Sequence, residues 1–177
     1  TAEDEAIDIP ARLEELVAHL KEETERLGLP MPRFLMEPGR SIVADAGMTL
    51  YTVGSIKRIP GYKQYAAVDG GMTDNPRYAL YQSRYTVYHG SKTGPTERFD
   101  VVGRCCESGD IIQPHVELPA DTCRGDILAV CTTGAYNYSM ASNYNRLPRP
   151  PIVMLTPEGS YTAVRRETFA DLTALDE

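Results

Sequence analysis

MTLYTVGSIKRIPGYKQYAAVDGG, residues 48–71, is the stretch that decides the fold of this chain. Its two arms, residues 48–59 and 62–71, are rich in β-branched and aromatic side chains, which favour extended strands. Pro60 and Gly61 stand between the arms and are typical of a type II turn. The stretch therefore predicts a β-hairpin.

The sequence that follows continues as short strands separated by turns. SKTGPT, ESGD, PADT and TPEG supply the Gly, Pro, Asp and Ser residues that turns require. The predicted strands are residues 84–89, 98–102, 126–132, 151–155 and 161–166, and a short helix is predicted in 167–176. This pattern predicts a mainly antiparallel β-barrel or sandwich domain over residues 47–177.

The sequence before the hairpin begins with a helical pattern. Residues 11–27, ARLEELVAHLKEETERL, repeat apolar side chains every three or four positions, with Glu and Lys between them. Pro10 stands near the first helical position and Gly28 follows the last one, as is usual for helix ends. These residues predict an amphipathic helix.

A short strand and a second helix are predicted between that helix and the hairpin. Residues 33–37, RFLME, are a short apolar run, and residues 41–47, SIVADAG, favour a helical turn. One helix, one strand and one helix cannot cover both faces of a parallel strand. Residues 1–46 are therefore predicted to be the tail of a larger α/β domain, so the fold class is α+β and the chain is interpreted as a fragment.

The overall composition excludes several classes of protein. The chain has 177 residues, 18 Lys and Arg against 25 Asp and Glu, a net charge of −7 and 42% hydrophobic residues. An acidic chain is a poor partner for nucleic acid, and no apolar run approaches the ~18 residues of a membrane span. The four cysteines show no zinc-binding spacing and are expected to be reduced thiols of a cytoplasmic protein.

The first candidate site is EPGR, residues 37–40. Gly39 lets the backbone approach an anion closely, and Arg40 adds a positive charge at the start of the predicted helix. This combination suits a phosphate or a carboxylate. The alternative is a tight turn with no further role.

The second candidate is DGGMTDNPRYALY, residues 69–81. On a helical turn, Arg77 and Tyr81 would share one face, so that a guanidinium and a phenol could hold a carboxylate together. The alternative is a surface turn in which Tyr81 is half-buried.

The third and fourth candidates are GRCCESGD, residues 103–110, and TTGAYNYSMASNYN, residues 132–145. The first places a thiol, which can donate a proton, beside a carboxylate on a turn. The second, whose three tyrosines are joined by the more distant Tyr161, suits stacking against a flat ligand. The alternatives are a buried structural cysteine and tyrosines that pack under the loop.

Taken in order, EPGR, DGGMTDNPRYALY, CCESGD and GAYNYSMASNYNRLPRP closely resemble motifs in the C-terminal part of the diaminopimelate decarboxylases. These enzymes form a group within the alanine-racemase-like, fold type III pyridoxal phosphate decarboxylases. The resemblance runs from about Asp8 to about Arg166. It implies that residues 1–46 are the end of an incomplete (β/α)8 barrel, that residues 47–177 are the C-terminal β domain, and that the protein is a homodimer.

The resemblance also implies roles around the cofactor, pyridoxal 5′-phosphate (PLP). Its phosphate would be bound by the EPGR segment, which consists of Glu37, Pro38, Gly39 and Arg40. Tyr136 would contact both cofactor and substrate.

The remaining implied roles concern the substrate, meso-diaminopimelate. Arg40, Arg77 and Tyr81 would hold the carboxylate at the end that does not react. Glu107 would pair with the ammonium group there, and Cys106, not Cys105, would be the proton donor. Cys106 and Glu107 would reach into the active site of the partner subunit.

Two alternatives to this activity remain open. Ornithine, arginine and carboxynorspermidine decarboxylases share the fold, although ornithine-type substrates lack the distal carboxylate that Arg77 would hold. A non-catalytic dimerisation module is the other possibility. Since the cofactor lysine of the family lies upstream of residue 1, the fragment alone is predicted to be inactive; none of Lys21, Lys57, Lys63 and Lys92 is typical of a Schiff-base lysine.

Overall fold

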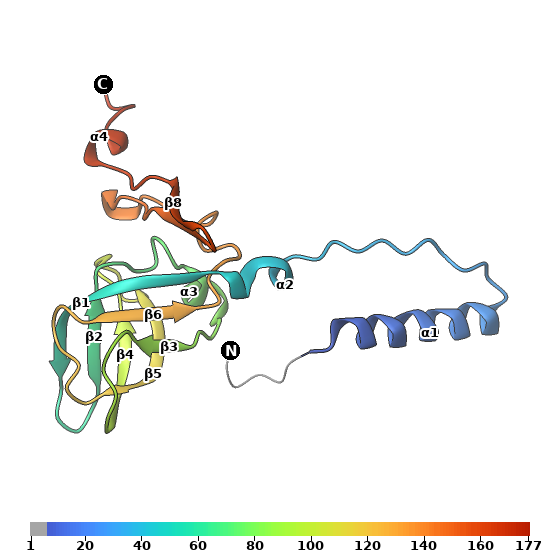
Figure 1. Cartoon of the computed structure of the whole chain (residues 1–177), viewed down its shortest axis with the longest axis horizontal. Helices are drawn as coiled ribbons and strands as arrows, with labels where there is room; N and C mark the ends of the chain where they lie inside the picture. Colours follow the sequence, from blue (N-terminus) through green and yellow to red (C-terminus); the bar gives the residue numbers. More distant parts are fainter. Residues whose placement is uncertain (1–6) are drawn as a thin grey trace. The chain divides into compact units, whose positions relative to one another are not determined.

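A computed structural model describes residues 7–177, and the chain divides into two compact units, residues 1–39 and residues 40–177. Figure 1 shows the helices and strands of both units. The predicted boundary between residues 46 and 47 stays a prediction. No helix in the described part of the chain is long and apolar enough to cross a membrane.

Helix α1 (Ile9–Leu27) makes up most of the first unit and confirms the helical prediction. Its first turn is capped by Asp8, whose Oδ1 accepts a hydrogen bond from the Ala11 N–H at 3.0 Å. The helix ends at Gly28, which has a φ of 64° and donates its N–H to Glu25. None of the helix side chains is buried, so the apolar stripe of α1 has no core to pack on within the described part of this unit.

The predicted strand at residues 33–37 is wrong for this chain, because residues 29–39 contain neither strand nor helix. A parallel strand is stable only when neighbouring strands pair with its N–H and C=O groups. No described strand pairs with this segment, which therefore stays irregular.

The second unit begins with the short helix predicted before the hairpin. Helix α2 (Arg40–Val43) runs into the 3-10 helix η1 (Ala44–Ala46). The hairpin itself is confirmed as β1 (Met48–Arg58) and β2 (Gln64–Val68), which pair antiparallel.

Four further strands complete one six-stranded sheet in the order β3-β6-β1-β2-β4-β5. They are β3 (Val87–His89), β4 (Thr96–Val102), β5 (Ile111–Pro119) and β6 (Ile127–Cys131). Every neighbouring pair is antiparallel except β2–β4, where Ala66 faces Val101 in a parallel register. The first and last strands in this order, β3 and β5, also contact each other, so the sheet is a nearly closed barrel. The predicted β-rich fold class is thus confirmed.

The barrel encloses one hydrophobic core, because alternate residues of each strand point inward. On β1, for example, Tyr51 and Val53 are buried. The core consists of Tyr51, Val53, Ala66, Val68, Tyr85, Val87, Phe99, Val101, Ile112, Val116, Leu118, Leu128 and Val130.

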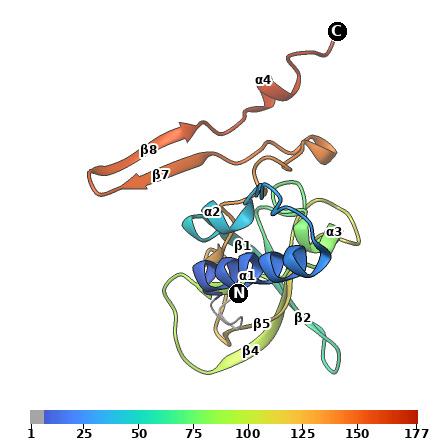
Figure 2. The same ribbon diagram turned by 90° about the vertical axis from the view of Figure 1, so that its right-hand side faces the viewer.

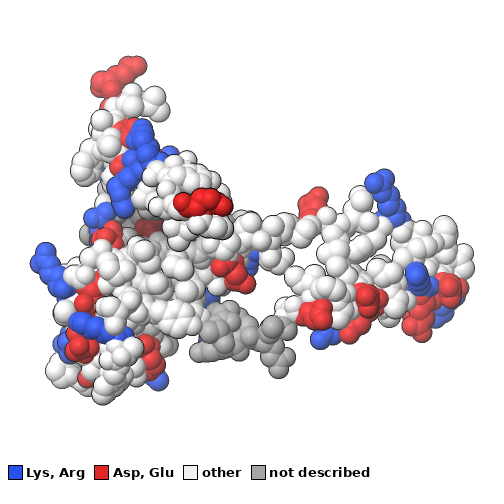
Figure 3. Space-filling model, viewed as in Figure 1, with Lys and Arg blue, Asp and Glu red and all other residues white. Residues whose placement is uncertain are grey.

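The two strands and the short helix predicted at the end of the chain are present, but the strands form a separate hairpin and not part of the barrel sheet. Figure 2 shows β7 (Ile152–Thr156) and β8 (Gly159–Val164) as a two-stranded ribbon. Helix α4 (Phe169–Leu172) begins at Thr168 with a capping box. In this region Figure 3 shows basic side chains beside acidic ones. The ion pairs are Arg146–Asp176, Arg149–Glu167 and Arg165–Asp171.

Candidate active site

Arg77 and Tyr81 lie on one face of helix α3 (Arg77–Tyr81), as their spacing predicts. The guanidinium carbon of Arg77 lies 5.1 Å from the centre of the Tyr81 ring. Pro76 precedes the helix, and Gln82 ends it in a left-handed conformation. The short helix therefore presents a cation and a phenol together.

Tyr136 reaches the same guanidinium from the 132–145 loop. Its ring centre lies 5.3 Å from the Arg77 guanidinium carbon, and its own backbone has a φ of 72°. Met140 in the same loop accepts a hydrogen bond from Arg77 Nη1 at 3.6 Å. The Arg77 guanidinium thus lies between two aromatic rings, where cation–π attraction holds it.

Arg77 has no carboxylate partner among the residues that the structure describes. The residue as a whole is half-buried. Its Nε atom is buried and makes no hydrogen bond with another described residue. A partly desolvated cation without an anion is unfavourable, so the site is suited to accept a carboxylate from a ligand.

The two neighbouring cysteines are in different environments. Cys105 is fully buried, and its Sγ lies 3.6 Å from Thr73 Oγ1. Burial raises the pKa of the Cys105 thiol, which keeps it protonated. Cys106 is exposed and has a φ of 55°. Of the two thiols, Cys106 is the one that a ligand can reach.

Glu107 follows Cys106 on the same exposed turn. Its Oε1 accepts hydrogen bonds from the N–H and hydroxyl of Ser108, at 2.9 and 3.1 Å, and its Oε2 accepts one from the Tyr144 hydroxyl at 3.2 Å. These bonds, led by that from the Ser108 hydroxyl, lower the pKa of the Glu107 carboxyl. Glu107 is therefore held as an anion that can pair with an ammonium group.

The 132–145 loop is hydrogen-bonded to the other three parts of the site in this unit. Ser142 donates its N–H to Thr73 O at 2.8 Å, and Gly134 donates its N–H to Ala44 O at 3.0 Å. Asn145 Nδ2 donates to Cys105 O at 2.6 Å. The loop thereby joins the 69–81 and 103–110 segments to the segment that begins with Arg40.

Some predicted site residues are not brought together in this way. Glu37, Pro38 and Gly39 belong to the first unit, and their part in a phosphate site stays a prediction. Tyr161 lies on β8, outside the loop that carries Tyr136.

Family models, curated proteins and solved structures that resemble this chain point to one family. The family described as "Pyridoxal-dependent decarboxylase, C-terminal sheet domain" matches residues 16–134. The chain belongs to this family. Within the family, it is 46% identical over 178 residues to diaminopimelate decarboxylase from Bacillus subtilis and 40% identical over 179 residues to that from Mycobacterium leprae. These alignments cover 99% and 96% of the chain, but only 40% and 38% of those proteins.

Solved structures of the pyridoxal-dependent decarboxylase family show the same fold. Diaminopimelate decarboxylase from M. jannaschii in complex with L-lysine is 34% identical, with a TM-score of 0.87 over 99% of this chain and 40% of that one. Lysine/ornithine decarboxylase from Vibrio vulnificus is less similar, at 26% identity and a TM-score of 0.62 over 76% of this chain and 36% of that one. The chain therefore spans about 40% of the length of the diaminopimelate decarboxylases that it matches.

A half-buried carboxylate, Asp74, and a buried one, Asp110, support the site of this decarboxylase domain, and the sequence analysis missed both. Asp74 accepts hydrogen bonds from the Gly71 N–H and from the Tyr51 hydroxyl. Burial raises the pKa of both Tyr51 and Asp74. The contact with Asp74 raises the pKa of Tyr51 further, whereas the hydrogen bond from Tyr51 lowers that of Asp74 and is outweighed by burial. Asp110 accepts hydrogen bonds from two backbone N–H groups. In the sequence, the Gly70–Gly71 dipeptide, which comes shortly before Asp74, was the available signal that a side chain approaches the backbone closely there.

Proposed function

We propose that the chain is the C-terminal part of a PLP-dependent diaminopimelate decarboxylase, a carboxy-lyase that converts meso-2,6-diaminopimelate into L-lysine and CO2. The observation that carries this proposal is the half-buried Arg77, which has two tyrosine rings beside it and no carboxylate partner among the described residues. A substrate with a second carboxylate, far from the reacting carbon, supplies that partner. The curated relatives named above have the same activity in their names.

The residues of the chain fit the proposed cofactor. No hydrogen bond or ion pair joins the Arg40 guanidinium to another described residue, so it is free to bind a phosphate. Glu37, Pro38 and Gly39 would complete the phosphate-binding turn, and Tyr136 would contact the cofactor ring. PLP supplies an electron sink for the carbanion that the departing CO2 leaves.

The side chains described above have distinct parts in the proposed reaction. Arg40, Arg77 and Tyr81 would hold the distal carboxylate of the substrate, and the ionised Glu107 would bind its distal ammonium. Leaving any of these charged and polar groups unpaired would penalise substrates without a second amino acid head. Cys106 would then donate a proton to the carbon that has lost CO2.

We further propose the assembly in which this chemistry takes place. Residues 1–46 would be the end of a (β/α)8 barrel and residues 47–177 the β domain of a cytoplasmic homodimer. Cys106 and Glu107 are exposed, and their exposure supports a site shared with the partner subunit. All four cysteines of the chain are free thiols, as is usual in the cytoplasm.

Substrate assays of the full-length protein test this proposal. We expect decarboxylation of meso-diaminopimelate and much slower reaction with ornithine, arginine or carboxynorspermidine. Arg77→Ala should lose activity on diaminopimelate selectively. A preference for ornithine, which lacks the distal carboxylate, would contradict the proposal and favour the second decarboxylase class.

The chain by itself should neither bind PLP covalently nor react. Lys63 and Lys92 have raised pKa values because hydrogen bonds from their ammonium groups to Asp100 and Asp126 stabilise the charged form. A Schiff-base lysine needs the opposite, a neutral amine. Borohydride reduction of the chain mixed with PLP should label no lysine selectively, and selective labelling would overturn this expectation. Sedimentation of the chain at several concentrations tests the alternative that it is a non-catalytic dimerisation module.

A further inference from the structure

Asp110 has no part in the proposed function, yet it lies at the point where two loops of the site meet. Its side chain is 5% exposed. Asp110 Oδ2 accepts a hydrogen bond from the Cys105 N–H at 2.6 Å, and Asp110 Oδ1 accepts one from the Met72 N–H at 2.7 Å. One carboxylate therefore joins the 103–110 turn to the 69–76 loop through two short, charge-assisted hydrogen bonds.

The backbone around Asp110 is built to admit its carboxylate. A Cβ atom on Gly71 would lie 2.6 Å from Asp110 Oδ1, and a Cβ atom on Gly103 would overlap the same carboxylate. Gly103 also donates its N–H to Asp110 O at 2.9 Å. Both glycines thus permit an approach that no other residue type allows.

Asp110 closes the turn that carries the exposed thiol. Its own N–H donates to Glu107 O at 3.1 Å, while its side chain holds the N–H of Cys105. Cys106, between these anchors, has a φ of 55°, which a non-glycine residue keeps only when its surroundings hold it there. The direction in which Cys106 and Glu107 leave the turn therefore depends on the two anchors.

We propose that Asp110 is a positioning residue that sets the orientation of Cys106 and Glu107 relative to the loop leading to Arg77. This inference rests on the proposed function for its kinetic consequences. A carboxylate is required because both of its oxygens face N–H donors. The isosteric Asn offers one oxygen and turns an NH2 group toward the other donor, so one hydrogen bond becomes a repulsive contact.

The first test measures the hydrogen bonds themselves, in the full-length protein carrying Asp110→Asn. Amide hydrogen exchange, resolved by fragmentation mass spectrometry, should be about tenfold or more faster at Cys105 or Met72, because a charge-assisted bond is lost. Asp69→Asn is the matched control, since the carboxylate of exposed Asp69 accepts one hydrogen bond from the described residues, from the Thr52 N–H at 2.8 Å. Unchanged exchange at both amides would overturn the inference.

The second test asks whether Asp110 acts through Cys106. Asp110→Asn should lower kcat on diaminopimelate roughly 10- to 100-fold, as misplacement of a reacting group does. In a Cys106→Ala background the same substitution should change kcat by less than about twofold, because no thiol is left to position. A purely structural role would instead make the two losses multiply, and that result would reject the inference.

The two tests also separate this inference from the proposed function. If the wild-type protein fails to decarboxylate diaminopimelate, the proposed function fails. Faster exchange at Cys105 or Met72 in Asp110→Asn would still support the positioning of the turn, and unchanged exchange would still overturn it.

Discussion

The guanidinium carbon of Arg77 lies 5.3 Å from the centre of the Tyr136 ring, although Arg77 lies on helix α3 and Tyr136 on the 132–145 loop. A hydrogen bond from the Ser142 N–H to Thr73 O also joins the 132–145 loop to the 69–81 segment. The site is thus a property of the tertiary fold as a whole.

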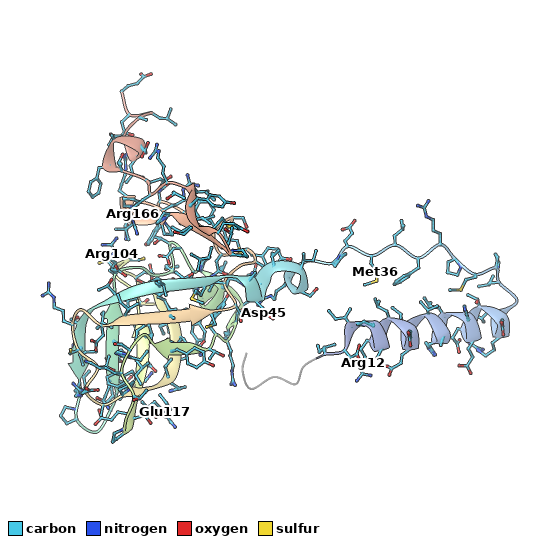
Figure 4. The ribbon with its side chains drawn as sticks, viewed as in Figure 1. Arg12, Met36, Asp45, Arg104, Glu117 and Arg166 are labelled. Carbon is cyan, nitrogen blue, oxygen red and sulfur yellow. The ribbon has the colours of Figure 1, made fainter. Side chains whose placement is uncertain are left out.

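Arg77→Lys should raise KM for diaminopimelate by roughly 10- to 100-fold in the full-length protein, since lysine lacks the planar fork that binds a carboxylate through two hydrogen bonds. Steady-state kinetics checks this. Arg98→Lys is the control, because Arg98 is exposed and pairs with Glu117. Figure 4 shows Glu117 at the far end of the barrel from Arg104, which belongs to the 103–110 turn of the site. Equal effects of both substitutions would contradict a carboxylate-binding role.

Ser108→Ala should raise the pKa of Glu107, and Tyr144→Phe should raise it by less. Both hydroxyls donate to the carboxylate and lower its pKa, and Ser108 makes the larger contribution. Carbon NMR titration of the Glu107 carboxyl measures the change. Tyr81→Phe should leave it unaltered, because no hydrogen bond joins Tyr81 to Glu107. The reverse order of Ser108 and Tyr144 would show that the turn geometry differs in solution.

Asp126→Asn should destabilise the chain by about 1–3 kcal/mol, because Asp126 Oδ2 accepts hydrogen bonds from Lys92 Nζ at 2.7 Å and from the Cys123 N–H at 2.8 Å. His89 contributes as well: its Nδ1 accepts backbone N–H groups, which leaves the ring proton on Nε2, 3.1 Å from Asp126. Urea unfolding at neutral pH measures the difference. Glu117→Gln, at an exposed ion pair, should cost far less.

The Asp126 contribution should also depend on pH. Burial opposes ionisation, but Lys92, the Cys123 N–H and His89 outweigh it and hold the pKa of Asp126 well below its usual range. As pH falls, the Asp126 carboxyl of the unfolded chain therefore takes up its proton at a higher pH than the same carboxyl in the folded chain. The stabilisation is present above pH ~4 and is lost as pH falls below that value toward the folded pKa. The gap between wild type and Asp126→Asn should narrow at low pH, and a constant gap would refute this account.

Glu167→Gln should loosen the segment that leads into the β7–β8 hairpin. Hydrogen bonds from the Arg149 guanidinium and N–H lower the pKa of Glu167 to about 2, so it is ionised at neutral pH. Glutamine loses the ion pair with Arg149, and the Arg149 amide should exchange faster with solvent. Glu158→Gln, in the exposed hairpin turn, should leave that amide unchanged. If Glu158→Gln has the larger effect, the Glu167 pair is not what holds this segment.

Local patterns were enough to predict the elements whose stability is local. The β1–β2 hairpin and helix α1 with its Gly28 end both follow from spacing and turn residues. Strand β5 was not predicted, because Pro114 interrupts IIQPHVELP and proline normally excludes a strand interior. The sheet accommodates it by shifting register near Val101, while His115 takes a φ of 58°.

The residues that support the site could not be predicted from the sequence, because their roles depend on contacts between distant segments. Asp110 in ESGD reads as ordinary turn chemistry, and only the fold directs its carboxylate at the N–H groups of Cys105 and Met72. The parallel pairing of β2 with β4 likewise depends on contacts between distant segments. The resemblance distinguished Cys106 from Cys105, but the physical difference between the two thiols, one exposed and one buried, depends on the fold.

The pairing of β1 with β6 has a consequence for how the chain is made. Residues 48–52 pair with residues 127–131, so a ribosome must release both strands before the barrel can close. Until then, the nascent β1–β2 hairpin presents an open hydrogen-bonding edge to the crowded cell. Closure across so long an intervening stretch is intrinsically slow, which prolongs the time for which this edge stays unpaired.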